Sequence, residues 1–477
     1  MALVEAIVWP IRQLCQFCKN IFQAGRDKKH KEMVEVNMKS GMLAYLKIRA
    51  IKVINSIIFV VKTIVNIILA GKDTYDEIGE CDVLLFCHDV DRGDTREGLA
   101  YSKLIDSVNE DLKSRGWSTS QLSTPGSLIK KTWGNSKTAN RRFHVISLLN
   151  SGKKSKLIHS LMRLFYWKTK KLDCYREEEF FFELLNRIKV KCIIGIELRR
   201  SLCFAANKAN IPAVELLHAM GYPSIPWGLD TAGAKYIPNG FLSLDSVSTT
   251  SLKPLISEGA RIWQINHPFY KRFNDRNAKK KLPKEWLNKP SWIPDKKRVI
   301  MVSFTWAYDG EVKEYADIFP NGLMPESLID AIRSSRENIF WLLRLHPVQL
   351  RKKLRYKKHI NLLEKLTKEN NNCEWEKSSV LNLLPLMNAC DGHVSMNSST
   401  CYDFALVNIP SLMLCPLLKN MPYFSDLKEL GLVTLGEFKA NDIIAWCLAV
   451  KKQYGYPGTT ICEWDDAVQW MLGDKCK

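Results

Sequence analysis

Two segments in the second half of the chain place side chains suited to binding an anion at the ends of predicted strands. The apolar run 340–345 contains Arg344 and is followed by His346 and Pro347. Proline restricts the preceding residue to extended backbone, which aims the imidazole off the carboxyl edge of the strand. We expect Arg344, His346 and Pro347 to bind a phosphate, with His346 stabilising charge on a departing group as an imidazolium. A histidine that only caps the strand end is the alternative.

The second segment is a hydroxyl-rich turn ahead of an apolar helix that begins near Cys401. Its residues Ser398, Ser399 and Thr400 offer hydroxyl and backbone N–H groups at the positive end of a helix. Ser and Thr at a helix start often serve only as a cap, so this turn alone is weak evidence for a phosphate site. Together with His346 it predicts one anion site served by two strand ends.

Carboxylates cluster in a loop of the first half, directly after the apolar run 83–87. Asp89, Asp91 and Asp94 are candidates for a general base, because neighbouring carboxylates raise one another's pKa. An Asp-rich loop is also a common form of plain solvated turn.

Three further residues are candidates for binding a second substrate: Arg92, Glu215 and His218. Glu215 and His218 form a second acid/base or ligand-positioning pair after another apolar run. The chain has no zinc-finger spacing, Walker loop or GxGxxG fingerprint, and we predict neither a metal nor another cofactor.

The elements that would position these residues are those of an α/β protein. After Gly71, short apolar runs alternate with longer helical patterns, which is typical of a parallel sheet with crossover helices. The predicted strands are Val83–Cys87, Val145–Leu149, Cys192–Ile196, Ala213–Leu217 and Ile262–Ile265 in one domain, and Val299–Phe304, Phe340–Leu345, Asp391–Val394 and Ser411–Leu414 in a second. The predicted division is 1–75, a basic amphipathic helical segment; 76–270, a Rossmann-like domain; 271–297, a linker; 298–460, a second Rossmann-like domain; and 461–477, a C-terminal helix or tail.

The strand end Leu343–Pro347, the Ser398-Ser399 pair and the later strand at Pro410 resemble bacterial GT-B glycosyltransferases of surface-polysaccharide assembly. The His-Pro and Ser-Ser elements are similar to those of sialyltransferases and Kdo transferases. This resemblance implies two doubly wound Rossmann-like domains facing a cleft, and it implies that His346, Ser398 and Ser399 contact the phosphate of a CMP-sugar.

The resemblance extends into the first domain and covers about residues 80–435. Segments 86–94 and 98–106 look like the acceptor-side loop of these enzymes, and 264–270 like the strand before their linker. Segment 215–221 resembles their Glu-x-x-His-Gly turn but has Ala-Met where a single Gly is usual.

Charge and hydropathy indicate the cellular compartment of the protein and whether it binds a membrane. The formal net charge is +20, and residues 1–72 hold 12 Lys and Arg against 4 Asp and Glu, beside the apolar stretch 51–70. Lys62 in the middle of that stretch disfavours a membrane span and favours a helix lying on an anionic membrane surface. An ordinary amphipathic helix packed on the domain, or a true span, are the alternatives. The scattered 14 cysteines favour a reducing compartment.

The sequence thus predicts a cytoplasmic enzyme, peripheral on the inner face of the cytoplasmic membrane. It would transfer a sugar from a nucleotide-activated donor to a glycan or lipid-linked acceptor, inverting the anomeric centre without a metal. A nucleotide-sugar epimerase of the same architecture and a noncatalytic membrane-tethered binding protein are alternatives. No basic-aromatic stripe typical of nucleic-acid binding is visible, so nucleic acid is not an expected partner.

Overall fold

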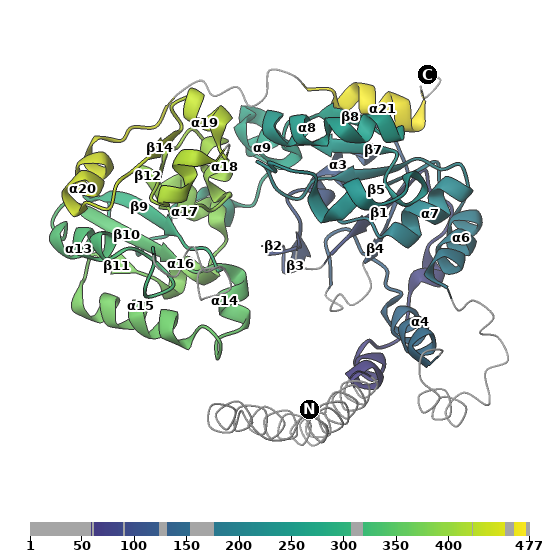
Figure 1. Ribbon diagram of the computed structural model, residues 1–477, viewed down its shortest axis with the longest axis horizontal. Coiled ribbons are helices and arrows are strands. Elements are labelled where there is room, and N and C mark those ends of the chain that lie inside the picture. The colour runs from purple at the N-terminus through teal and green to yellow at the C-terminus, as the bar shows by residue number, and fades with distance from the viewer. Residues whose placement is uncertain are drawn as a thin grey trace, which may run out of the picture. The chain divides into compact units, whose positions relative to one another are not determined.

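The computed structural model describes residues 59, 62–88, 91–123, 131–152, 176–306, 318–421, 423–453 and 462–473 (Figure 1). These residues belong to two compact units. The described part of the smaller unit comprises residues 59, 62–79, 122–123, 137–152 and 176–184. The larger unit contains both of the large sheets except residues 122–123, the end of one edge strand.

The first sheet has six strands in the order β4-β1-β5-β6-β7-β8. Its strands are β1 (Val83–Cys87), β4 (Thr119–Ser123), β5 (Cys192–Gly195), β6 (Ala213–Leu216), β7 (Gly240–Ser243) and β8 (Arg261–Gln264). The pairs from β1 through β8 along this order are parallel. Strand β4 lies on one side of β1 and β5 on the other, and β6, β7 and β8 follow outward from β5. The order therefore reverses between β1 and β5, as in flavodoxin-like sheets.

The second sheet also has six strands, in the order β11-β10-β9-β12-β13-β14. Its strands are β9 (Arg298–Ser303), β10 (Ile339–Arg344), β11 (Cys373–Glu374), β12 (Gly392–Ser395), β13 (Ser411–Met413) and β14 (Val433–Leu435). All five pairings are parallel. Numbered from β9, this is the 3-2-1-4-5-6 order of a Rossmann sheet, with its reversal between β9 and β12. The prediction of two Rossmann-like α/β domains is confirmed.

Helices join the strands of the two sheets. Those of the first half are α3 (Ile105–Ser114), α4 (Asn140–Gly152), α6 (Glu177–Ile188), α7 (Arg200–Lys208) and α8 (Ser246–Leu252). Those of the second are α13 (Glu326–Ser334), α14 (Pro347–Arg351), α15 (Lys357–Glu369), α16 (Glu376–Val380), α17 (Leu383–Ala389), α18 (Thr400–Ala405), α19 (Ser425–Glu429) and α20 (Ala440–Ala449). A two-stranded hairpin of β2 (Asp94–Arg96) and β3 (Leu99–Tyr101) precedes α3.

One predicted strand is wrong. Residues 145–149 lie inside helix α4, where Phe143 and Ile146 are buried one turn apart. A short apolar run does not distinguish a strand from a buried helical turn, and the polar start of α4 at Asn140 is the signal that decides this case.

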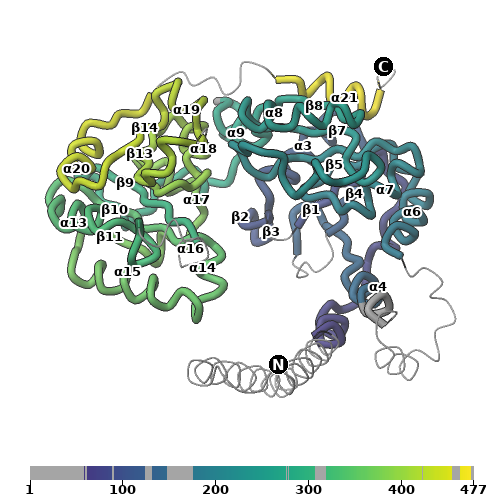
Figure 2. Tube along the Cα trace, in the orientation of Figure 1, coloured from purple at the N-terminus to yellow at the C-terminus, as the bar shows by residue number. Residues whose placement is uncertain are grey.

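Two segments connect the sheets. The chain passes from β8 to β9 through α9 (Pro268–Asn274), α10 (Arg276–Lys279) and α11 (Lys284–Leu287), so the predicted linker is partly helical. Trp286 within it is 1% exposed, and its indole N–H donates to the carbonyl of Thr95 at 3.1 Å. After α20 the chain runs to α21 (Trp464–Leu472), which lies beside β8 (Figure 2). Its Trp464 and Met471 belong to the core of the first sheet.

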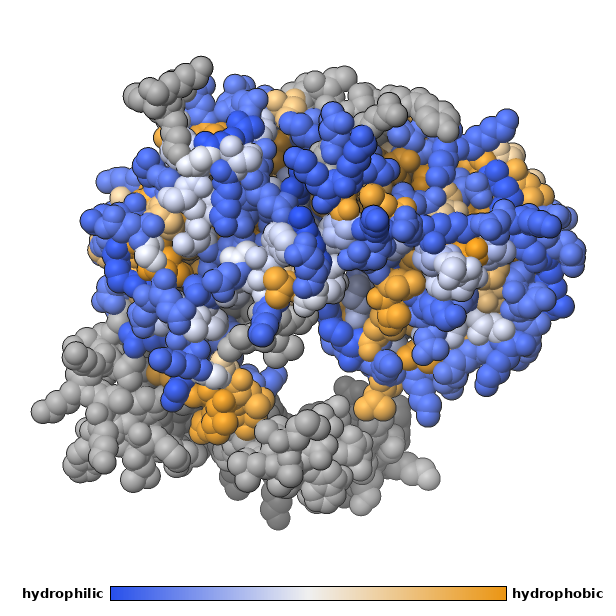
Figure 3. Space-filling model, turned by 180° about the vertical axis from the view of Figure 1, so that it is seen from behind, coloured by the Kyte–Doolittle hydropathy of each residue, from blue (hydrophilic) through white to orange (hydrophobic). Residues whose placement is uncertain are grey.

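Of the predicted membrane segment, residues 1–58 and 60–61 lie outside the described residues. Residues 62–69 are helical, and Ile68 and Leu69 there are 65% and 57% exposed. The face shown in Figure 3 is mostly hydrophilic, with separate smaller groups of apolar residues. Within the described ranges, no helix is both long and apolar enough to cross a membrane.

Candidate functional site

The carboxyl edge of the second sheet brings together the two predicted anion-binding segments. His346 follows β10 and Ser398 follows β12, and both strands pair with β9 so that Arg344 and Ser395 each lie level with Ser303. Neighbouring strands are about 4.8 Å apart, so the two segments start about 10 Å apart on one edge. The Thr305 hydroxyl donates to Asn397 Oδ1 at 3.1 Å, which joins the ends of β9 and β12 at the point where the strand order reverses.

His346 is the N-cap of helix α14. Its Nδ1 accepts a hydrogen bond from the Val348 N–H at 3.2 Å, and its own N–H donates to Gln349 Oε1 at 2.8 Å. Burial, with Arg351 and Arg344 nearby, lowers the pKa of His346 to about 4. The free protein therefore favours the neutral imidazole at neutral pH, and an imidazolium beside a departing nucleotide stays a prediction. Because Nδ1 accepts, the proton of the neutral ring is on Nε2, which can donate to a phosphate oxygen.

This low pKa has a consequence for stability. Between pH 6.5 and about 4 the unfolded chain binds a proton at His346 that the folded chain does not, so we expect the free energy of unfolding to fall as the pH falls through that window. Denaturant unfolding at pH 7 and pH 4.5 measures the loss, which His346→Asn should reduce. An equal loss in that variant would contradict the assignment.

Arg344 and Pro347 have structural partners. The Arg344 guanidinium donates to the backbone carbonyls of Ser378 and Leu381, the latter at 2.8 Å. Burial lowers its pKa to about 10, opposed by Asp94 and Asp403. Pro347 is the first residue of α14, where a missing N–H costs no hydrogen bond. Their predicted contacts with a donor phosphate stay a prediction.

The hydroxyl-rich turn leads into α18. The Ser398 and Thr400 hydroxyls lie 2.9 Å apart, and the Thr400 N–H donates to Ser398 Oγ at 3.3 Å. Ser399, the N-cap, is exposed and makes no side-chain capping bond. The structure thus holds Ser398 and Thr400 in a local turn and leaves the Ser399 hydroxyl at the surface.

The carboxyl edge of the first sheet carries an acid–base cluster, which we define as His88, Asp91, Glu197, Glu215 and His218. His88 follows β1 and Glu197 follows β5, the two strands between which the order reverses. His88 Nε2 lies 3.0 Å from Glu197 Oε2, and His218 Nδ1 lies 3.7 Å from Glu197 Oε1. Glu197 therefore has a histidine against each carboxylate oxygen.

Burial shifts the pKa of two carboxyls of the acid–base cluster upward. Burial raises the pKa of Glu215 to about 8, although the carboxyl accepts N–H bonds from Leu198 and Glu197 at 2.8 and 2.6 Å. Burial also raises the pKa of Asp91, opposed by His218 and His88. The hydrogen bond from His88 instead lowers the pKa of Glu197. Neighbouring carboxyls thus have pKa values pushed in opposite directions, as acid–base sites require.

The other predicted residues of the first domain have partners outside this cluster or lie outside the described residues. Asp94 pairs with Lys103 at 3.6 Å on the hairpin. Arg92 is 2% exposed, donates to Gln121 Oε1 at 2.6 Å and faces the buried Asp106. Asp89 lies outside the described residues. Of the two predicted bases that the structure describes, Asp91 and Asp94, Asp91 is the one whose carboxyl feels the charge of His218.

Sequence reasoning missed His88, Glu197, Tyr222 and Trp227 as site residues. Tyr222 Oη lies 3.2 Å from His218 Nε2, and the Trp227 ring centroid lies 5.6 Å from that of His218. The sequence could have indicated His88 and Glu197 as site residues, because each directly follows an apolar run. Tyr222 and Trp227 lie in an irregular loop whose path no periodicity predicts.

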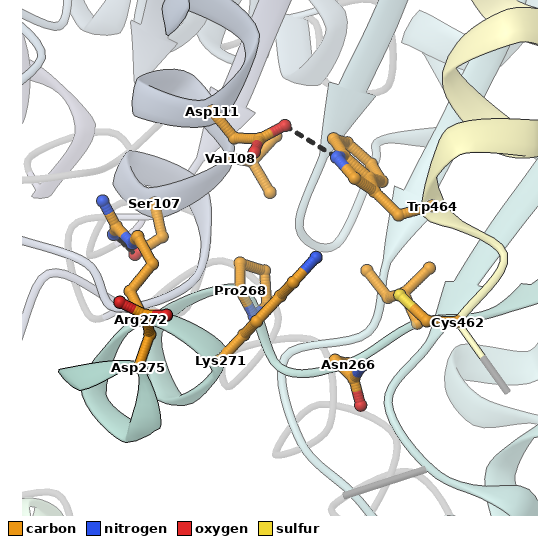
Figure 4. Close-up of a pocket in the computed structure, with 11 residues that line it drawn as sticks. Ser107, Val108, Asp111, Asn266, Pro268, Lys271, Arg272, Asp275, Cys462 and Trp464 are labelled. Carbon is orange, nitrogen blue, oxygen red and sulfur yellow. Dashed lines mark hydrogen bonds between the residues drawn. The ribbon is translucent and has the colours of Figure 1, made fainter. Parts of the chain in front are cut away.

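A separate pocket of about 330 Å³ opens beside the start of α9. Val108, Ile265, Pro268 and Trp464 line it, and the Trp464 indole donates to Asp111 Oδ2 at 2.7 Å (Figure 4). None of the residues predicted from the sequence lines this pocket.

Comparison with known proteins gives only distant similarities. No protein-family model matches the sequence, and no curated protein matches it. The UDP-GlcNAc 2-epimerase of Methanocaldococcus jannaschii, solved with UDP-GlcNAc and UDP, is 12% identical with a TM-score of 0.49, covering 82% of this chain and 98% of that one.

Two of the similar structures are named as transferring or polymerising enzymes. The wall teichoic acid polymerase TagF is 13% identical with a TM-score of 0.44, covering 88% of this chain and 90% of that one. The spinosyn forosaminyltransferase SpnP is 11% identical with a TM-score of 0.41, covering 77% and 90%. At such TM-scores the assignment of two Rossmann-like domains rests on the strand orders of the chain itself.

Proposed function

We propose that this protein is a glycosyltransferase that uses a nucleotide-activated sugar. The proposal rests on the two sheet edges at which the strand order reverses. The edge of the second sheet presents a neutral histidine and hydroxyls, and the edge of the first presents the acid–base cluster. Ligands of doubly wound sheets bind outside the carboxyl ends of the strands where the order reverses. One edge is thus suited to an anionic leaving group and the other to proton transfer.

In this mechanism the donor phosphate lies at the second sheet. His346 Nε2–H and the exposed Ser399 hydroxyl would donate to its oxygens. Neutral donors that are already held in place stabilise the charge that develops as the nucleotide departs. This interpretation replaces the imidazolium with a neutral hydrogen-bond donor and keeps the predicted phosphate contact.

Proton transfer from the acceptor hydroxyl falls to the first sheet. An imidazole backed by a carboxylate is an effective base near neutral pH, and His218 faces Glu197 in that way. We assign His218 as the general base and Glu197 as the residue that positions it. Asp91, one of the three bases proposed from the sequence, is the competing assignment, because its raised pKa makes it a stronger base than an ordinary aspartate.

A nucleotide-sugar epimerase is the second candidate. The observation in its favour is that the acid–base cluster contains several groups able to exchange protons, and inversion at a carbon needs one group to remove a proton and another to return it. The two functions differ in one requirement, since a transferase needs an acceptor and an epimerase changes its donor alone.

Thermal unfolding with nucleotides tests the donor site. We expect one of CMP, UDP and GDP, added at 100 times its Kd, to stabilise the chain by about 2.7 kcal/mol, and His346→Asn to weaken that stabilisation. The sequence resemblance favours CMP and a surface-polysaccharide acceptor. No stabilisation by any of the three would contradict the proposed function, and conversion of the donor sugar without acceptor would favour the epimerase.

A membrane-surface location, on the cytoplasmic side, is part of the proposal. Deletion of residues 1–72 should abolish sedimentation with liposomes containing anionic lipid, because the chain loses 12 basic residues and its apolar stretch. Liposomes of neutral lipid are the control. Unchanged sedimentation of the deletion variant would contradict this location.

A further inference from the structure

Trp227 is an exposed aromatic residue beside the acid–base cluster. It lies in the short helix η4 (Pro226–Thr231), with 38% of its surface exposed. Its ring centroid is 5.6 Å from that of His218 and 5.9 Å from that of Tyr222. The indole therefore extends the surface formed by His218, the group that we assign as the base.

The backbone at Trp227 is in the left-handed region. Its φ of 56° and ψ of 20° are unfavourable for a bulky side chain, and Gly228 follows with a φ of 63°. The Gly228 carbonyl accepts hydrogen bonds from the Arg200 guanidinium at 3.0 Å and the Thr231 hydroxyl at 2.9 Å. These bonds hold the strained turn in place. Strain of this kind concentrates at ligand-binding positions, where it fixes a side chain in the orientation that a ligand needs.

The exposed indole offers an apolar face and a polar edge. Among the hydrogen bonds of the described residues, none uses the Trp227 indole N–H. A pyranose ring has the complementary chemistry, because its C–H face is apolar and its hydroxyls accept hydrogen bonds. Aromatic residues with one polar atom suit such mixed surfaces.

The nearby charges restrict the ligand further. Glu197 and Asp91 belong to the same cluster, and carboxylates disfavour an anionic ligand such as a nucleotide phosphate or an acidic sugar. We infer that Trp227 forms the floor of a subsite for an uncharged hexose or N-acetylhexosamine of the acceptor, next to His218. This inference rests on the proposed function, which supplies the acceptor.

Ligand titrations with defined sugars test the subsite. The probes are the methyl β-glycosides of glucose, galactose and N-acetylglucosamine, titrated by NMR into the full chain, with CMP, UDP and GDP titrated in parallel. We expect at least one glycoside to bind the wild type, Trp227→Ala to weaken it about 5- to 10-fold, and Trp227→Phe to retain most of the affinity. Ile256→Ala, which removes another exposed apolar side chain of the same domain, should change nothing.

The outcomes separate the subsite from the proposed function. Unchanged glycoside affinity in Trp227→Ala, a wild type that binds no glycoside, or a loss of nucleotide affinity in that variant would each overturn the subsite. Glycoside binding that depends on Trp227 in a chain that binds no nucleotide would support the subsite and contradict the proposed donor.

Stability measurements exclude a purely structural role for the ring. Glycine adopts a positive φ without strain, so Trp227→Gly should melt no lower than Trp227→Ala while losing glycoside binding equally. A large drop in Tm for both variants would show that the ring serves the fold and would overturn the inference.

Discussion

Replacement of His218 by Ala is expected to lower the rate of sugar transfer by about 100- to 10,000-fold, the usual contribution of a general base. The imidazole lies between Glu197 at 3.7 Å and Tyr222 at 3.2 Å, and the other imidazole of the cluster, His88, lies against the opposite oxygen of Glu197. Donor affinity should not change, because the donor phosphate is assigned to the other sheet. The measurement is the initial rate of transfer at saturating donor, with donor binding titrated separately.

Glu197 and Asp91 give the comparison that assigns the base. If Glu197 positions His218, Glu197→Gln should slow transfer less than His218→Ala, and the double variant should be no slower than His218→Ala alone. Glu258→Gln, at an exposed glutamate of the same domain, is the matched control. A loss in Asp91→Asn that exceeds the loss in His218→Ala would instead make Asp91 the base.

The second large effect is expected at His346, where capping and donor contact can be separated. His346→Asn retains an oxygen that can accept the Val348 N–H and removes the Nε2–H; His346→Ala removes both. Both variants should lower donor turnover about 100- to 1,000-fold, as loss of a preorganised donor does. Only His346→Ala should also lose about 1 kcal/mol of stability with the helix cap.

Turnover and denaturant unfolding of the two variants check this separation. Normal turnover in His346→Asn would contradict the phosphate contact. If His346→Asn, which retains the helix cap, is fully active and His346→Ala is not, the histidine serves only to cap helix α14.

The architecture was predictable because its strands are buried on both faces. Strand β1 coincides with the predicted Val83–Cys87, and the strands around Cys192 and Phe340 are within a few residues of their predictions. Strands β4, β7, β11 and β14 were not predicted. β4 has the largely polar sequence TSQLS, β7 (GFLS) has only two apolar side chains, and β11 and β14 are two and three residues long, so none gives an apolar run that stands out from its surroundings.

The candidate site was predictable only in its position. The sequence correctly placed His346 and Ser398 at one edge of the second sheet, because the carboxyl ends of parallel strands lie at the same edge. The protonation of His346 depends on burial and on the bond from the Val348 N–H, and neither is visible in a sequence. The pairing of His88 with Glu197 joins residues 109 positions apart, and it follows from the β1–β5 register rather than from any local motif.

The return of α21 to the first sheet affects how the protein is made. Trp464, Val468 and Met471 complete a hydrophobic core whose other members, such as Val83 and Leu216, are synthesised more than two hundred residues earlier. The first domain therefore cannot close its core on the ribosome until residues 464–471 have been synthesised. Its apolar surface stays exposed while the second domain is synthesised. A nascent chain stalled before residue 464 should therefore be the species that most needs a chaperone.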